Sequence, residues 1–178
     1  TYIYIADNYC HLKKDWRSAM QEAKYQIKNW KKWKATKYLL IQTKNELMND
    51  IKAITYTDEL PGGSHKSIAD KYNKLIEDVK IYDDYINAYG FFINRLENAI
   101  ATMLNENQRK AVIIYSNNPY KGGYEKRIEE ALKTGFSKSY FYDLLTESYE
   151  ILGSVLDIEC DENRTIIESV DKSRTKNA

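Results

Sequence analysis

The sequence predicts an all-α protein in which a long, coiled-coil-like helical hairpin precedes a small helix-turn-helix bundle. Apolar residues recur in alternating steps of four and three over residues 68–104, and a mean spacing of 3.5 residues is the repeat of a coiled coil. The seam consists of Ile68, Tyr72, Leu75, Val79, Tyr82, Ile86, Tyr89, Ile93, Leu96, Ile100 and Met103. A matching seven-residue repeat lies upstream, at Trp33, Leu40, Leu47 and Ile54. Only two prolines and seven glycines interrupt the 178 residues.

Residues 12–54 are expected to form the first arm of the hairpin, as one helix or as two with a break. The early part of this arm has its own apolar stripe at Trp16, Met20, Ala23, Ile27 and Trp30. The strongest helix breaker in the chain, Pro61-Gly62-Gly63, lies between the two arms. Helices of matched period joined by a short loop pack most simply as an antiparallel pair. Residues 1–9 alternate weakly, and this pattern fits a frayed or helical start as well as a strand.

Composition and charge are those of a soluble helical protein: 43% of residues are hydrophobic and 30% are charged. No apolar run approaches the roughly 20 residues of a membrane span, and we find no export signal. Cys10 and Cys160 are too few for a disulfide framework, so we expect a reducing, cytoplasmic setting. The net charge of +1 hides a gradient, because residues 11–52 hold eleven basic against four acidic residues and residues 141–178 hold four against nine.

A group of lysines surrounds Trp30 and Trp33, namely Lys28, Lys31, Lys32, Lys34 and Lys37. One interpretation is a surface for nucleic acid or for an anionic membrane. The alternative, which we favour, is a solvated helix face on which the lysine stems cover apolar rings.

The seam is longer than its partner, because the upstream repeat matches only part of its length. We therefore expect a homodimer or a higher oligomer that forms through the long helices. The alternative is a compact monomer in which residues 12–30 and 138–158 cover the remaining seam.

A new, compact region is expected to begin near residue 105. Asn105 and Gln108 have the spacing of an N-cap and its capping-box partner, for a short helix from Glu106 to about Tyr115. Asn117-Asn118-Pro119 should stop this helix, and Lys121-Gly122-Gly123 should form a flexible joint. We thus expect a hairpin domain at 1–104, a DNA-binding domain at 105–158 and a polar tail, mobile or weakly helical, at 159–178.

Within this domain, residues 124–134 and 138–158 form the expected helix-turn-helix. Ile128, Ala131 and Leu132 would form the inner face of the first helix, which Gly135 ends. Phe136 then serves as an apolar anchor and Ser137 as an N-cap. The inner face of the second helix would consist of Phe141, Leu144, Leu145, Ser148, Leu152, Val155 and Leu156. A short helix, a glycine turn and a capped second helix are the layout of the DNA-binding motif, although an ordinary helical hairpin is the alternative.

The candidate DNA-binding residues follow from this layout. The N-terminal part of the second helix would read base edges with Lys138, Ser139 and Tyr142. The joint and the first helix would contact backbone phosphates through Lys121, Lys126, Arg127 and Lys133.

Residues 104–115 (LNENQRKAVIIY) and 130–145 (EALKTGFSKSYFYDLL), with the glycine joint between them, resemble the end of phage ArpU/RinA-type late transcription regulators. The stretches NWKKWK (29–34) and LPGGS (60–64) echo the helical N-terminal part of that family. The resemblance spans about residues 28–158. It implies a sigma factor region-four-like C-terminal part, double-stranded DNA and RNA polymerase as partners, regulation of phage late genes, and location in the bacterial host cytoplasm.

Catalytic and metal-binding patterns are scarce in the sequence. His11 and His65 are its only histidines, and Cys10-His11 has no second ligand pair at metal spacing. We therefore expect no enzyme activity, metal or cofactor. The alternative to a DNA-binding regulator is a helical protein-interaction module, such as an inhibitor or an adaptor, without DNA binding.

Overall fold

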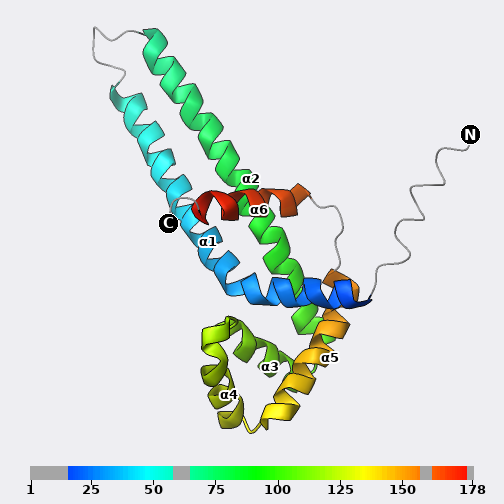
Figure 1. Ribbon diagram of the computed structural model, residues 1–178. Helices are drawn as coiled ribbons and strands as arrows, with labels where there is room; N and C mark the ends of the chain where they lie inside the picture. The colour runs from blue at the N-terminus through cyan, green and yellow to red at the C-terminus, as the bar shows by residue number, and fades with distance from the viewer. Residues whose placement is uncertain (1–15, 58–64, 157–161, 176–178) are drawn as a thin grey trace, which may run out of the picture. The chain divides into compact units, whose positions relative to one another are not determined.

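The computed structural model describes residues 16–57, 65–156 and 162–175, and in these ranges the chain is helical without any strand (Figure 1). The all-α prediction is therefore confirmed. The helices are α1 (Trp16–Thr57), α2 (His65–Met103), α3 (Glu106–Asn117), α4 (Tyr124–Lys133), α5 (Lys138–Leu156) and α6 (Glu162–Thr175), with one 3-10 turn, η1 (Lys121–Gly123).

The two long helices, α1 and α2, pack antiparallel, as the matched repeats predict (Figure 1). Of the two alternatives for the first arm, the single helix is right, because α1 is uninterrupted from Trp16 to Thr57. The expected start of that arm at residue 12, the breaker at 61–63 and residues 1–9 lie outside the described residues. In α2, His65 is three positions ahead of the first seam residue.

The chain divides into two compact units, and the long helices contribute to both. The bundle unit comprises Thr1–Lys31 and Asn94–Glu159. The hairpin unit comprises Lys32–Ile93 and Cys160–Ala178. The ends of α1 and α2 thus belong to the same compact unit as α3, α4 and α5.

The seam of α2 forms the less exposed face of that helix, but its burial is uneven. Tyr89, Ile93, Leu96 and Ile100 are buried. The earlier positions are half-buried, at Tyr72, Leu75, Val79, Tyr82 and Ile86. Met103, the last position, is exposed. Near the middle of α2 the buried face widens beyond a two-position seam, because Ala88 and Phe92 are buried as well.

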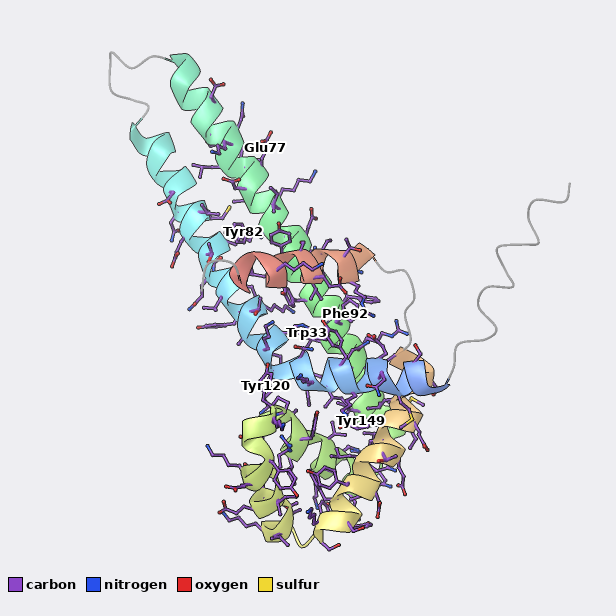
Figure 2. The ribbon with its side chains drawn as sticks, in the orientation of Figure 1. Trp33, Glu77, Tyr82, Phe92, Tyr120 and Tyr149 are labelled. Carbon is purple, nitrogen blue, oxygen red and sulfur yellow. The ribbon has the colours of Figure 1, made fainter. Side chains whose placement is uncertain are left out.

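The hairpin unit centres on aromatic contacts between α1 and α2. Trp33 is buried, and its ring centroid lies 5.6 Å from that of Phe92 (Figure 2). Leu40, one heptad later, is also buried, whereas Leu47 is half-buried. Further along, the Lys44 ammonium pairs with the Asp83 carboxylate at 2.5 Å. Trp33 and Leu40 therefore have the inward positions that the heptad repeat predicts.

Residues 162–175 form helix α6, so of the two alternatives for the tail the helix is right. Ile167 and Val170 are buried and Ile166 is half-buried, which makes α6 amphipathic. The Arg164 guanidinium bonds Glu168 one turn later, at 3.1 Å. Residues 162–175 are thus mostly polar, but their few apolar side chains share one face of the helix.

The bundle unit has one continuous core formed by α3, α4 and α5 with the adjoining ends of α1 and α2. The largest fully buried side chains include Ile27, Leu96, Val112, Phe141, Leu145, Leu152 and Leu156. Gly153 allows α1 and α5 to approach closely, since a Cβ there would lie 2.8 Å from the Ala19 carbonyl. The predicted inner face of α5 is confirmed, with Val155 half-buried and the other six positions buried.

Side chains from both long helices satisfy the last carbonyls of α5. The Gln26 amide donates to the Leu156 carbonyl at 3.1 Å, and the Arg95 guanidinium donates to the Val155 carbonyl. A positive group at a helix C-terminus also interacts favourably with the helix dipole. These contacts hold α5 against α1 and α2 within the bundle unit.

Candidate nucleic-acid interface

The turn between α4 and α5 has the backbone geometry of a complete Schellman motif. The Phe136 N–H donates to the Ala131 carbonyl at 2.9 Å, and the Gly135 N–H donates to the Leu132 carbonyl at 3.0 Å. Gly135 has φ +88°, a left-handed conformation that glycine adopts without strain. Phe136 and Ala131 are both buried, so the apolar contact that accompanies the motif is also present. The predicted roles of Gly135 and Phe136 are confirmed.

Ser137 caps the second helix, as predicted, because its hydroxyl accepts from the Tyr140 N–H at 3.3 Å. The turn therefore fixes where α5 begins and presents its first residues to solvent. Lys138, Ser139 and Tyr140 are exposed there. A defined helix start is what base reading by an N-terminal turn requires.

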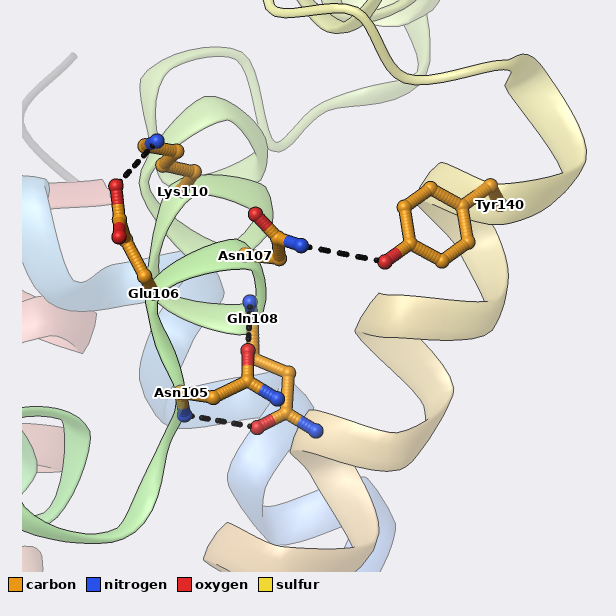
Figure 3. Close-up of polar contacts among 6 residues, drawn as sticks. All are labelled: Asn105, Glu106, Asn107, Gln108, Lys110 and Tyr140. Atoms are coloured by element: carbon orange, nitrogen blue, oxygen red, sulfur yellow. Dashed lines mark hydrogen bonds and ion pairs between the residues drawn. The ribbon is translucent and has the colours of Figure 1, made fainter.

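The start of α3 is confirmed in detail (Figure 3). The Asn105 side chain accepts from the Gln108 N–H at 2.9 Å, and the Gln108 side chain accepts from the Asn105 N–H at 3.0 Å. This is the predicted capping box. In the same turn, the Asn107 amide donates to the Tyr140 hydroxyl at 3.3 Å and thereby links α3 to the first turn of α5.

The three lysines predicted to contact phosphates differ in their surroundings. Lys121, Lys126 and Lys133 are all exposed. Lys133 pairs with Glu129 at 2.7 Å, and this hydrogen bond raises the pKa of Lys133 and lowers that of Glu129. Lys121 lies in η1, which is a 3-10 turn where a flexible joint was expected.

Lys138 lies over an aromatic ring at the α5 N-terminus. Its ammonium is 5.5 Å from the centroid of Tyr124, the first residue of α4. A hydrogen bond to the Tyr124 side chain raises the pKa of Lys138. The cation stays exposed while the ring limits its range of positions.

Arg127 is buried, so its expected role as a surface phosphate contact needs correction. Its guanidinium donates to the carbonyls of Asn118 and Tyr120, the second at 2.8 Å. It also lies 5.4 Å from the Tyr115 ring centroid and 6.0 Å from that of Tyr124. Arg127 therefore ties the segment between α3 and α4 to α4 and is not available to an external phosphate.

Two further positions differ from the sequence interpretation. Leu132 was expected on the inner face of α4 but is 60% exposed, because Arg127, Ile128 and Ala131 occupy that face. Tyr142 was expected to point outward, yet it is half-buried and packs against the core, 5.2 Å from the Phe141 ring centroid.

The outward face of α5 includes residues that were not singled out from the sequence. Asp143, Thr146 and Glu150 are exposed and follow Ser139 at helical spacing. The first turn of α5 contains no acidic residue. These polar residues recur every three or four positions from Ser139, and this spacing is the sequence signal that could have identified the outward face.

A buried tyrosine pair joins α3 to α5. The ring centroids of Tyr115 and Tyr149 are 6.1 Å apart with nearly perpendicular planes. Burial raises the pKa of both side chains. Figure 2 marks Tyr149 within the bundle.

The tryptophans near the lysine group face inward. Trp33 packs on Phe92 in the hairpin unit. In the bundle unit the Trp30 indole N–H donates to the Glu97 carboxylate at 3.0 Å, and the Lys28 ammonium lies 5.3 Å from the Tyr120 ring centroid. These contacts agree with lysines that cover aromatic rings.

No protein-family model, curated protein or solved structure matches this chain. Within the described ranges, no helix combines the length and apolarity of a membrane span, and no group of three His, Cys, Asp or Glu side chains could hold a metal ion. Cys10 and His11 lie outside those ranges.

Proposed function

We propose that the bundle unit binds duplex DNA, with the first turn of α5 entering the major groove, and that the protein regulates transcription. The observation that supports this proposal best is the hydrogen-bonded α4–α5 turn. It combines the Schellman motif at Gly135 with the Ser137 cap and leaves Lys138 and Ser139 exposed. A helix start held in this way is the element that DNA-binding helix-turn-helix motifs place against base edges.

The charge distribution sets the direction of approach. Lys126 on α4 and Lys138 at the start of α5 are exposed, whereas the exposed acidic residues Asp143, Glu147 and Glu150 follow further along α5. Phosphates attract the first group and repel the second. The helix would therefore enter the groove by its N-terminal end, with its acidic portion directed away from the phosphates.

A regulator of this kind gains specificity by presenting two such units, because dimers contact two half-sites. In the hairpin unit Leu39, Ile76 and Ile81 are exposed apolar residues, which favours self-association through the long helices. We propose this homo-oligomer, and contact with RNA polymerase in regulation of phage late genes, as the context of DNA binding.

The second candidate function is a helical protein-interaction module without DNA binding. Exposed apolar side chains on the bundle unit favour it, namely Leu132 on α4 and Ile113 on α3. Large apolar residues at a surface contribute to protein interfaces more than to contacts with phosphates.

Binding to duplexes decides between these functions. Duplexes selected by the parent protein from a randomised pool, and scrambled versions of them, are titrated at two salt concentrations. Lys126→Ala/Lys138→Ala should weaken binding to both duplexes and lower the salt slope by about one unit for the lost Lys126 phosphate contact. Loss of Lys138 at the base-reading turn should in addition reduce the preference for the selected duplex. Ser139→Ala should instead change the preference between duplexes.

The matched control is Lys74→Ala/Lys80→Ala, which removes two exposed lysines from α2 in the hairpin unit. If the Lys126→Ala/Lys138→Ala variant binds duplexes as tightly as this control, the proposed role of α5 is wrong. If the parent binds no duplex even at low salt, the protein-interaction function becomes the better proposal.

A further inference from the structure

We infer that the phosphate-binding surface continues past the helix-turn-helix onto α1, along alternating lysines and tyrosines in the bundle unit. The inference rests on the proposed DNA binding and adds lysines of α1 to the phosphate contact already expected at Lys121. Its starting point is Lys28, whose ammonium lies over the Tyr120 ring at 5.3 Å. This contact joins the basic face of α1 to the segment between α3 and α4, although the two are about ninety residues apart in the sequence.

The α1 side of this surface is a basic stripe. Lys24, Lys28 and Lys31 are exposed and spaced by four and three residues, so they share one face of the helix. The adjoining face, with Ala23 and Ile27, is buried in the bundle core. Packing of that apolar face therefore fixes the direction in which the lysine stripe points.

The surface then crosses η1 to the start of α5. Tyr120 is exposed and is followed at once by the exposed Lys121. Arg127 holds the Tyr120 carbonyl at 2.8 Å and lies 6.0 Å from the Tyr124 ring, and that ring lies under Lys138. A series of contacts described above thus runs from Lys28 through Tyr120 and Tyr124 to the α5 N-terminus.

The chemistry of this surface fits a phosphodiester backbone better than bases. One face of each ring is already covered by a lysine ammonium, so the rings hold cations in position. Among the described residues no carboxylate is within ion-pair distance of Lys28 or Lys121, in contrast to Lys133 with its partner Glu129. A duplex carries one negative charge per about 1.7 Å of its axis, so a continuous basic surface contacts several phosphates at once. The occupant is the backbone of the same duplex that α5 contacts, in the stretch flanking the base-reading turn.

The test removes the α1 end of the surface and leaves α5 intact. Lys28→Ala/Lys121→Ala is compared with the parent and with Lys74→Ala/Lys80→Ala, at several salt concentrations and on duplexes of decreasing length. The salt slope on long duplexes should fall by about two units in the Lys28/Lys121 variant only. The affinities of the parent and this variant should converge on the shortest duplex that still binds, because that duplex no longer reaches α1.

Lys28→Gln/Lys121→Gln keeps most of each side-chain stem and should behave like the alanine variant, while far-ultraviolet circular dichroism confirms that both are folded. Equal salt slopes for the Lys28/Lys121 variant and the control would overturn the inference. If the Lys126/Lys138 variant is still weakened in that case, the proposed function stands without the extension. Loss of single-stranded but not of duplex binding in the variant would also overturn it, and a parent that binds no duplex removes both proposals.

Discussion

In the hairpin unit the seam of α2 is only half-buried from Tyr72 to Ile86, whereas in the bundle unit Leu96 and Ile100 are buried within a continuous core. The two stretches belong to one helix with one repeat. What differs is the number of neighbours: among the described residues, the bundle unit gathers five helical segments, whereas the hairpin unit contains segments of α1 and α2 together with α6. The bundle also has capped helix starts, a Schellman turn and side chains that satisfy helix ends. The apolar repeat alone thus defines which face of a helix packs inward. Local hydrogen bonds at turns and helix ends are needed to define a single arrangement of the helices.

The largest expected difference between the units is the cost of truncating a core side chain. Phe141→Ala removes a ring with no exposed surface and should lower the free energy of unfolding by about 3–5 kcal/mol. Leu75→Ala removes a half-buried side chain in the hairpin and should cost roughly 1–2 kcal/mol. Hydrogen exchange of the backbone amides in α5 and in residues 72–86 measures each unit separately. If either variant lowered the protection from exchange equally in both groups of amides, the two units would unfold as one.

Replacing Arg127 tests whether polar contacts define the bundle. Arg127→Met keeps the stem but loses the bonds to the Asn118 and Tyr120 carbonyls, which we expect to cost about 2–4 kcal/mol. Exchange in residues 118–123 should rise more than in α5. Lys126→Met, at the exposed neighbouring position, is the control and should leave the unfolding midpoint in urea nearly unchanged.

The α4–α5 turn offers a smaller effect with a close control. Gly135→Ala places a side chain at φ +88° and should destabilise the bundle by about 1–2 kcal/mol. Gly122→Ala adds its Cβ to open space and should be neutral. Both are measured by urea unfolding. A neutral Gly135→Ala would mean that the turn can relax without cost.

The smallest effect concerns the ion pair of the hairpin. Lys44 and Asp83 are both partly exposed, so Lys44→Ala should change stability by no more than about 0.5 kcal/mol. Thermal unfolding in low and high salt measures this, and the difference from the parent should vanish in high salt. A larger, salt-independent loss would place the lysine stem, rather than its charge, in the packing.

The parts of the fold that the sequence predicts are those with local causes. Asn105 with Gln108, Gly135 and Ser137 each form contacts with residues a few positions away, and the seam of α2 depends on spacing alone. The inward position of Arg127 could not be foreseen, because it depends on carbonyls that only the folded segment 118–120 presents.

The candidate site was predicted less fully than the fold. Exposure of Lys138 and Ser139 follows from the cap, but the packing of Tyr142 against the core depends on the tertiary arrangement of the bundle. Lys28 illustrates the same limit, since its place over Tyr120 depends on the docking of α1 in the bundle. Non-local packing therefore decides which members of a basic group share a surface.

The buried tyrosine pair gives the bundle unit a proton-linked stability. Burial raises the pKa of Tyr115 and Tyr149 above the ordinary value of 10.0, so the folded state retains protons that the unfolded chain releases in alkali. The stabilisation is complete below pH 10 and declines as the pH rises above it. Ionisation of these two side chains in alkali should therefore accompany the opening of α3 from α5.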